Sequence, residues 1–265
     1  MSASSVFRND VLAGKVALVT GGGSGICYGI AERMMEHGAV AAIVGRKAER
    51  LEKSAKELSE KTGKECLALP CDVRDPVAVG AALARTIERF GKLDILVNGA
   101  AGNFLAPAAQ LSPNGFKTVL EIDAMGTFNV TRAAFDAWLR DHGGVVLNIS
   151  ATLHLAATPL QIHASAAKAA IDSMTRSFAL EWASLGIRVN GIAPGPIDDT
   201  EGMSRLAPGD VKERVLKMIP IGRFGTIREI ADIALFLSTD AASLIHGETL
   251  VADGGAWFGS GRALG

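Results

Sequence analysis

Short β-branched runs alternate with longer amphipathic stretches along the whole of this 265-residue chain. Such an alternation is typical of a parallel sheet that is covered by helices on both faces. No Pro/Gly/Ser-rich linker and no internal repeat interrupts it, and the length suits one large domain. We therefore predict an α/β fold with one doubly wound domain built on a seven-stranded parallel sheet.

The breaks between the predicted elements indicate where a ligand binds. We predict strands at Val16–Thr20, Val40–Val44, Glu65–Cys71, Ile95–Asn98, Val145–Ser150, Arg188–Ala193 and Thr249–Val251, and helices that include Ala48–Lys61, Val77–Phe90, Gly126–Arg140, Ala164–Ala183 and Ile227–Ser238. Glycine- or proline-containing breaks follow the first, fourth and sixth strands, at Gly21–Gly25, Gly99–Asn103 and Pro194–Pro196. Because the carboxyl ends of parallel strands border the ligand crevice of such sheets, we expect the site there.

Residues Val16–Ile26 combine a buried strand, a glycine turn and the start of a helix. Glycines let the backbone approach a pyrophosphate closely, and a helix N-terminus offers free N–H groups and a positive dipole end. A glycine pattern alone also fits a surface turn, but its place between a strand and a helix indicates dinucleotide binding. The predicted contacts are Gly21, Gly23, Ser24, Gly25 and Ile26.

The end of the second strand indicates which dinucleotide binds. NAD sites commonly have an acidic residue there for the ribose hydroxyls, whereas a 2′-phosphate needs a cation. This chain has no acid in Ile43–Lys47, and Arg46 is suited to a bidentate phosphate contact. We therefore predict NADPH (NADP⁺) as the cofactor. The alternative is a solvated Arg-Lys pair that opens a helix.

Composition excludes several other classes of site. The formal net charge of -1 gives no electrostatic footprint for nucleic acid. No apolar run approaches the roughly 18 residues of a membrane span, and the first ten residues lack the apolar core of a secretion signal. Cys27, Cys66 and Cys71 are odd in number and lack zinc-like spacing, which favours free thiols and no metal site. We expect a soluble, intracellular protein.

Three later segments complete a recognisable pattern. Asp72-Val73 follows the third strand, Asn98-Gly99-Ala100 closes the fourth, and Pro194–Thr200 follows the sixth. With the glycine turn, these segments resemble the short-chain dehydrogenase/reductase family over nearly the whole chain. The resemblance implies one NADP-binding Rossmann domain over residues 1–265. It places Asp72 and Val73 at the adenine, Asn98, Gly99 and Ala100 beside the cofactor, and Pro194, Gly195, Ile197 and Thr200 over the nicotinamide.

Position 27 departs from the family pattern. The spacing TGxxxGxG would place a glycine where this chain has Cys27. Crowding there would affect helix–strand packing or the approach of the cofactor. Two interpretations stay open: a tolerated small residue and a reactive cysteine.

Most catalytic positions of the family are substituted. An ordinary member carries Asn, Ser, Tyr and Lys, and this chain keeps only Lys168. Ala164 stands four residues before it, in place of the tyrosine, and the only tyrosine, Tyr28, lies in the glycine-rich region. Ala151 occupies the serine position and Asp123 the asparagine position. General acid catalysis contributes about 10²–10⁴-fold, so a carbonyl reductase with these losses should be badly impaired.

The substituted pattern resembles the peroxisomal 2,4-dienoyl-CoA reductase branch of the family. The likeness rests on Asn98–Phe104, Ile122-Asp123, Asn148–Thr152, His163–Lys168 and Ala252–Trp257. It implies NADPH-dependent reduction of 2,4-dienoyl-CoA to 3-enoyl-CoA, an auxiliary reaction of unsaturated fatty-acid β-oxidation. In that reaction the proton is needed at a carbon.

The same resemblance implies the proton donor. Asp123 and Lys168 would hold a water that gives the proton, and Lys168 would also bind the nicotinamide ribose. A carboxylate beside an ammonium should stay ionised, so water is the more plausible immediate acid. The alternatives are an N-terminal helix residue without catalytic duty at Asp123 and a solvated helix lysine at Lys168.

An acyl-CoA substrate needs cations for its phosphates and apolar surface for its tail. The predicted substrate contacts are Arg74, Phe104, Ser112, Asn114, His163 and Arg205, with a closing lid within about residues 198–220. Phe104 would pack on the acyl chain, Ser112 and Asn114 would contact the thioester arm, and the two arginines would bind phosphates. Each is alternatively a surface residue, and His163 alternatively packs inside the protein or, as a rival, supplies the proton.

Other functions stay open on the sequence. One is a reductase of another enoyl or carbonyl substrate, and one is a non-catalytic NADPH-binding scaffold. The family resemblance further implies a homotetramer and peroxisomal localisation. Because Arg262–Gly265 is not an SKL-type tripeptide, the cytosol is the alternative compartment.

Overall fold

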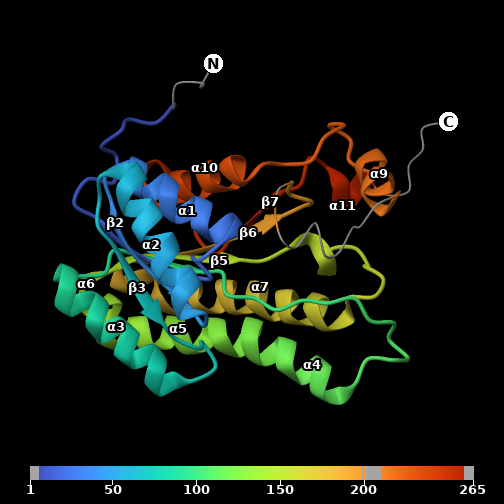
Figure 1. The fold of residues 1–265 in the computed structure, drawn as a ribbon, viewed down its shortest axis with the longest axis horizontal. Helices are drawn as coiled ribbons and strands as arrows, with labels where there is room; N and C mark the ends of the chain where they lie inside the picture. Colours follow the sequence, from blue (N-terminus) through green and yellow to red (C-terminus); the bar gives the residue numbers. More distant parts are fainter. Residues whose placement is uncertain (1–5, 199, 201–209, 260–265) are drawn as a thin grey trace.

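A seven-stranded parallel sheet forms the centre of the protein (Figure 1), in the strand order β3-β2-β1-β4-β5-β6-β7. The computed structural model describes residues 6–198, 200 and 210–259. Each neighbouring pair of strands is parallel. The order of the strands reverses between β1 and β4, which is the position where doubly wound sheets bind ligands. The predicted doubly wound α/β fold is confirmed.

The elements agree with the predicted ranges to within one or two residues in most places. The strands are β1 Val16–Thr20, β2 Val40–Gly45, β3 Cys66–Pro70, β4 Ile95–Asn98, β5 Gly144–Ile149, β6 Ile187–Pro194 and β7 Thr249–Ala252. The helices are α1 Gly25–Glu36, α2 Ala48–Thr62, α3 Pro76–Phe90, α4 Pro113–Leu120, α5 Gly126–Ala134, α6 Arg140–His142, α7 Ile162–Trp182, α9 Asp210–Lys217, α10 Ile227–Leu237 and α11 Ala256–Gly259.

Apolar side chains leave the sheet on both faces. Along β1, Ala17 and Val19 belong to the hydrophobic core on one side, and Leu18 belongs to the core on the other. Helices α1, α2 and α10 cover the first face, and α3, α5 and α7 cover the second (Figure 1). Successive residues of a strand point to opposite faces, which explains why the strands are nearly continuous apolar runs.

The helix predicted at Gly126–Arg140 begins earlier than expected. Helical backbone starts at Pro113 and continues through α4, a π-helical turn at Glu121–Met125, α5 and a second π-helical turn at Phe135–Leu139 into α6. The Ser112 hydroxyl caps the start by accepting from Gly115 N, and proline is well tolerated in the first turn. Gly126 is therefore an interior residue, and a Cβ there would lie 2.5 Å from Val73.

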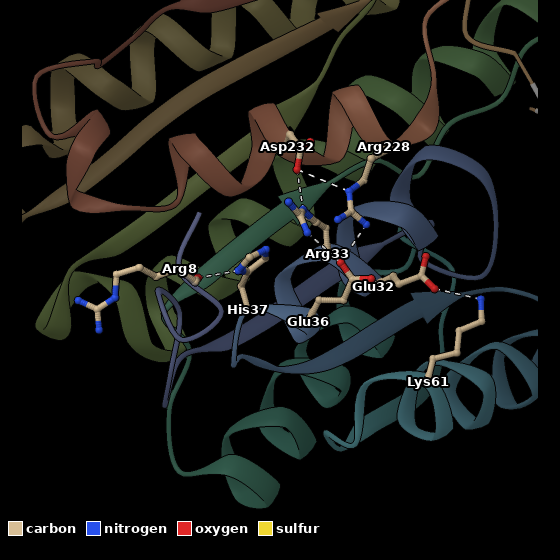
Figure 2. Close-up of polar contacts among 8 residues, drawn as sticks. All are labelled: Arg8, Glu32, Arg33, Glu36, His37, Lys61, Arg228 and Asp232. Carbon is tan, nitrogen blue, oxygen red and sulfur yellow. Dashed lines mark hydrogen bonds and ion pairs between the residues drawn. The ribbon is translucent and has the colours of Figure 1, made fainter. Parts of the chain in front are cut away.

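A buried arginine ties α1 to α10, as Figure 2 shows. The Arg33 side chain is 4% exposed and pairs with Asp232 at 2.5 Å and with Glu36 at 3.0 Å. Arg228 of α10 reaches Glu36 at 2.9 Å. A buried guanidinium is stable only with such partners. The network therefore joins the helix that follows the glycine turn to a helix near the other end of the chain.

Residues 6–198, 200 and 210–259 contain neither a membrane-spanning helix nor a cluster of metal-ligating side chains. None of their helices combines the length and the apolar character that a bilayer crossing requires. Nor do their His, Cys, Asp and Glu side chains gather in threes or more as they would around a metal ion. Cys27, Cys66 and Cys71 are free thiols.

Candidate active site

A pocket of 260 Å³ lies at the carboxyl ends of β1 and β2. Seven of the predicted cofactor contacts line it: Gly21, Gly23, Ser24, Arg46, Asp72, Val73 and Ala100. Lys47 and Arg50 also line this pocket, although neither is among the cofactor contacts predicted from the sequence. The combination of glycine backbone, cations and one carboxylate fits a phosphate-bearing dinucleotide.

The glycine turn and the break after β4 touch each other. Gly21 has a φ of 72°, and a Cβ on it would lie 2.8 Å from the carbonyl oxygen of Gly99. The Thr20 hydroxyl accepts hydrogen bonds from Gly99 N at 2.9 Å and from Ala100 N at 3.1 Å. Two segments that are separate in the sequence therefore form one floor, and Gly21 is required by both its backbone angle and its close approach.

The lining of this pocket carries charges of both signs. Arg46 is exposed at the end of β2. On the other side, Asp72 pairs with Arg74, the Nη2 to Oδ2 distance being 2.6 Å. The hydrogen bond from Arg74 holds the pKa of Asp72 below its usual range, and the charge of Arg46 lies close enough to help lower this pKa. The exposed guanidinium of Arg46 is therefore suited to bind a phosphate, and Asp72 accepts hydrogen bonds as an anion.

Cys27 is packed beneath the glycine floor and away from solvent. Burial raises the pKa of its thiol to about 12. A Cβ on Gly99 would lie 2.0 Å from the Cys27 Sγ, so the sulfur fills the space under that glycine. A thiol with so high a pKa carries almost no thiolate at neutral pH, which supports the small-residue interpretation over a reactive cysteine.

Asp123 and Lys168 form a buried ion pair. The distance from Lys168 Nζ to Asp123 Oδ2 is 3.2 Å, and the two side chains are 10% and 1% exposed respectively. Lys168 also donates to the Ile149 carbonyl at 3.0 Å, and Asp123 Oδ1 accepts from Gly102 N at 2.7 Å. Asp123 lies in the π-helical turn inside the long helix rather than at a helix N-terminus. Such turns often occur at functional sites.

The ion pair is hydrogen-bonded to Gly102, which lies between two cavities. Gly102 donates to Asp123, and its neighbours Ala101 and Asn103 line different cavities. The second cavity measures 440 Å³ and lies beside the loop that follows β5. It is lined mainly by apolar side chains, among them Leu153, Ala156, Pro159, Val215, Met218, Ile219 and Trp257. Pro194, Gly195, Ile197 and Thr200, predicted near the nicotinamide, also border it, as does Ile26, which was predicted at the glycine turn.

The predicted substrate contacts are distributed over several places. Phe104 stacks on His163, with ring centroids 4.3 Å apart, and the Phe104 carbonyl is 3.0 Å from His163 Nε2. His163 is fully buried, its Nε2 is held by the Phe104 carbonyl, and it is not among the residues that line the two cavities. Ser112 caps α4, Asn114 is exposed on that helix, and Arg74 pairs with Asp72. Arg205 lies outside the described residues, as does much of the predicted lid.

Comparison with known proteins decides the family. A family model described as "Enoyl-(Acyl carrier protein) reductase" matches residues 21–256. A structure of a short chain dehydrogenase from Bacillus anthracis has a TM-score of 0.84 and 39% identity, covering 92% of this chain and 96% of that one. The chain belongs to the short-chain dehydrogenase/reductase family.

Two curated relatives narrow the branch. A Danio rerio protein named peroxisomal 2,4-dienoyl-CoA reductase [(3E)-enoyl-CoA-producing] is 49% identical over 256 residues, which cover 96% of this chain and 85% of the relative. A Rattus norvegicus protein of the same name is 51% identical over 254 residues, with 96% and 87% covered. The predicted resemblance to this branch is confirmed.

The substituted positions of the short-chain dehydrogenase/reductase site are filled in different ways. Ala164, at the tyrosine position, is 2% exposed and packs with Val119 and Ala167. Ala151, at the serine position, lines the apolar cavity. Asn98 turns into the core, where its amide donates to Thr131 and Asn148. Position 164 therefore carries a packed alanine and no proton donor. Asn98 joins β4 to α5 and β5 through its two hydrogen bonds.

Proposed function

We propose that this protein is an NADPH-dependent 2,4-dienoyl-CoA reductase that forms 3-enoyl-CoA. The observation that carries the proposal is the buried Asp123–Lys168 pair, which is hydrogen-bonded to Gly102 between a nucleotide-type pocket and an apolar cavity. Alanines at positions 151 and 164 remove the serine that holds a carbonyl oxygen and the tyrosine that protonates it in ordinary family members. The names of the two curated relatives support the same substrate and product.

The nucleotide pocket supplies the groups that NADPH needs. The glycine turn and the start of α1 would hold the pyrophosphate, Arg46 the 2′-phosphate, and Asp72 the adenine. The segment Pro194–Ile197 would cover the nicotinamide from the side of the apolar cavity. When bound, NADPH supplies a hydride to the substrate. The predicted cofactor residues that line the two cavities thus fit both halves of the dinucleotide.

The proton has to come from a group beside Asp123. Asp123 Oδ1 accepts a hydrogen bond from Gly102 N, and Oδ2 lies 3.2 Å from the Lys168 ammonium, so both oxygens already face donor groups. Lys168 has three N–H donors. Its contacts with Ile149 and Asp123 use two, so one can serve a ribose hydroxyl or a water. A water held by this pair is the donor that we propose for the substrate carbon.

The apolar cavity suits the acyl chain. Among the described residues its lining carries no Lys, Arg, Asp or Glu, in contrast to that of the nucleotide pocket. Burial of apolar surface stabilises by about 25 cal/mol per Å², so such a wall favours a hydrocarbon over a polar substrate. Phe104 remains our proposed contact for the acyl chain, and Arg74 remains our proposed contact for the CoA phosphates.

The test is to follow NADPH absorbance with 2,4-dienoyl-CoA substrates of several chain lengths. We expect oxidation of NADPH and a product whose double bond NMR places at carbon 3. A 2-enoyl-CoA and a simple ketone serve as matched controls for the other reductase activities. NADPH oxidation with a control but not with the diene would favour the alternative reductase. Binding of NADPH without any turnover would favour the non-catalytic scaffold.

We propose that the enzyme assembles as a homotetramer. Apolar side chains stand exposed on the long helices, among them Met125, Phe128 and Leu180, the last being 84% exposed. Val251 of β7 is 40% exposed. Burial of such residues by further copies would stabilise an assembly. Light scattering on a size-exclusion column gives the mass, and a monomer would contradict this part of the proposal.

We propose the peroxisome as the compartment, with the cytosol as the alternative. The names of both curated relatives include that organelle. Microscopy of the chain carrying an N-terminal fluorescent tag, beside a peroxisomal marker, distinguishes the two. Diffuse fluorescence would favour the cytosol.

A further inference from the structure

His163 is buried beside the site and has a single polar contact in the part of the chain that the structure describes. Its side chain is 0% exposed, and Nε2 lies 3.0 Å from the Phe104 carbonyl. A carbonyl oxygen only accepts, so Nε2–H must be the donor. Within the described ranges Nδ1 has no hydrogen-bond partner. The one hydrogen bond of this buried imidazole therefore fixes the position of the backbone at Phe104.

The backbone that His163 holds is the segment that orients Asp123. Two residues before Phe104, Gly102 N donates to Asp123 Oδ1 at 2.7 Å. Gly102 also lies against the turn that carries the carboxylate, since a Cβ on it would be 3.1 Å from Ile122. A shift of this segment would therefore move the hydrogen bond that fixes one oxygen of Asp123.

Other contacts show that the segment is clamped to the start of α7. Asn103 Nδ2 donates to Gln161 Oε1 at 2.6 Å, and Ala106 N donates to the Leu160 carbonyl at 2.9 Å. Leu160 has a φ of 65°, a left-handed conformation that non-glycine residues rarely adopt. Such strain persists only where surrounding contacts enforce it. Phe104 adds a ring that stacks on His163.

From this geometry we propose that His163 is a positioning residue, which holds Gly102–Phe104 so that Gly102 aims Asp123 at the water and at Lys168. The inference rests on the proposed function, because it assigns Asp123 to proton delivery. His163 itself touches no reacting atom.

Two amide substitutions test the role. In His163→Gln the amide nitrogen can take the place of Nε2, whereas in His163→Asn it falls near the position of Nδ1 and cannot reach Phe104. Misplacement of a catalytic group by about 1 Å can cost up to 10²-fold. We expect H163N to lower kcat about 10- to 100-fold with the Kd for NADPH unchanged, and H163Q to stay within about threefold of wild type.

A double-mutant cycle separates positioning from general damage. If His163 acts through Asp123, then adding H163N to Asp123→Ala should not lower the residual single-turnover rate further. A solvent isotope effect on kcat should also rise in H163N, because proton delivery becomes slower. Independent losses in the cycle, or equal rates for H163N and H163Q, would overturn the proposal. If H163N does not fold, His163→Phe keeps the stacked ring and removes only the hydrogen bond, with the same outcomes.

A measurement without substrate keeps the two proposals apart. Hydrogen exchange of peptides that contain residues 99–106 should be faster in H163N than in wild type and unchanged in H163Q. Unchanged exchange in H163N would contradict positioning even in an active enzyme. Conversely, a wild-type protein that does not reduce dienoyl-CoA but shows this exchange pattern would refute the proposed function and retain the clamp.

Discussion

The nucleotide pocket and the apolar cavity meet at Gly102, but they are built from different parts of the chain. The first is made of a glycine turn, strand ends and charged side chains that follow them directly. The second is made of small and aliphatic side chains from the loop after β5, the segment after β6 and the C-terminal part. A diphosphate needs fixed backbone donors, whereas a hydrocarbon needs only a wall of suitable shape. The first therefore leaves a motif in the sequence and the second does not.

The largest effect should come from Asp123, which is hydrogen-bonded to Gly102 between the two cavities. Asp123→Ala removes the carboxylate that pairs with Lys168, and we expect kcat to fall about 10²–10⁴-fold, the usual contribution of general acid catalysis. The Kd for NADPH should stay unchanged, because the cofactor pocket is intact. Stopped-flow turnover and fluorescence titration measure the two quantities. Retention of wild-type kcat would refute the water-donor mechanism.

The next effect should be confined to the nucleotide pocket. Arg46→Ala removes the cation at the end of β2, and we expect the Kd for NADPH to rise about 10- to 100-fold, as for loss of charge-assisted hydrogen bonds. The Kd for NADH should change little, because NADH lacks the 2′-phosphate. Lys53→Ala, which removes an exposed lysine of α2 that pairs with Glu57, is the matched control. Equal weakening of both cofactors would remove Arg46 as the selectivity determinant.

A smaller effect should be confined to the apolar cavity. Ala156→Phe narrows the cavity, and we expect the KM for long-chain dienoyl-CoA to rise about tenfold while short-chain substrates and NADPH bind normally. Leu155→Phe places the same ring on the neighbouring residue, which does not line the cavity. Steady-state kinetics over a series of chain lengths compares the two variants. The same KM series in both would show that the acyl chain lies elsewhere.

The smallest effect on cofactor binding is expected from Cys27, whose sulfur packs under Gly99. Because burial raises the pKa of Cys27 to about 12, native protein at pH 8 should resist alkylation by iodoacetamide at this thiol. The rate should increase as pH rises toward 12. Cys27→Ala should change the Kd for NADPH by less than about threefold, since only the packing under Gly99 is reduced. Peptide mass spectrometry reads the alkylation, and rapid labelling at pH 8 would restore the reactive-thiol interpretation.

The sequence predicted the features that follow from short-range pattern. All seven strands, the glycine turn and the position of Lys168 could be identified because apolar period and motif spacing determine them locally. The long helix was placed too late, since Gly126 resembled a boundary although it is a packing requirement against Val73. Its true start depends on the Ser112 cap and Pro113, a signal that is present in the sequence.

Long-range contacts account for what the sequence could not predict. Leu153, Met218 and Trp257 line one cavity although more than 100 residues separate the first from the last. Ser112 was predicted at the substrate, and it caps a helix. His163 was singled out for its place beside Ala164, but only the fold shows that it holds Phe104. Pattern identifies which residues are unusual, and packing determines which backbone or ligand each one reaches.

The ion-pair network of Figure 2 has a consequence for synthesis of the chain. Arg33 and Asp232 are 199 residues apart, so α1 leaves the ribosome long before the partner that neutralises its buried guanidinium. The glycine turn at the head of α1 is made early as well. We expect a nascent chain to acquire affinity for NADPH only after α10 has emerged, so that the first half of the Rossmann domain waits for the end of translation before it can bind cofactor.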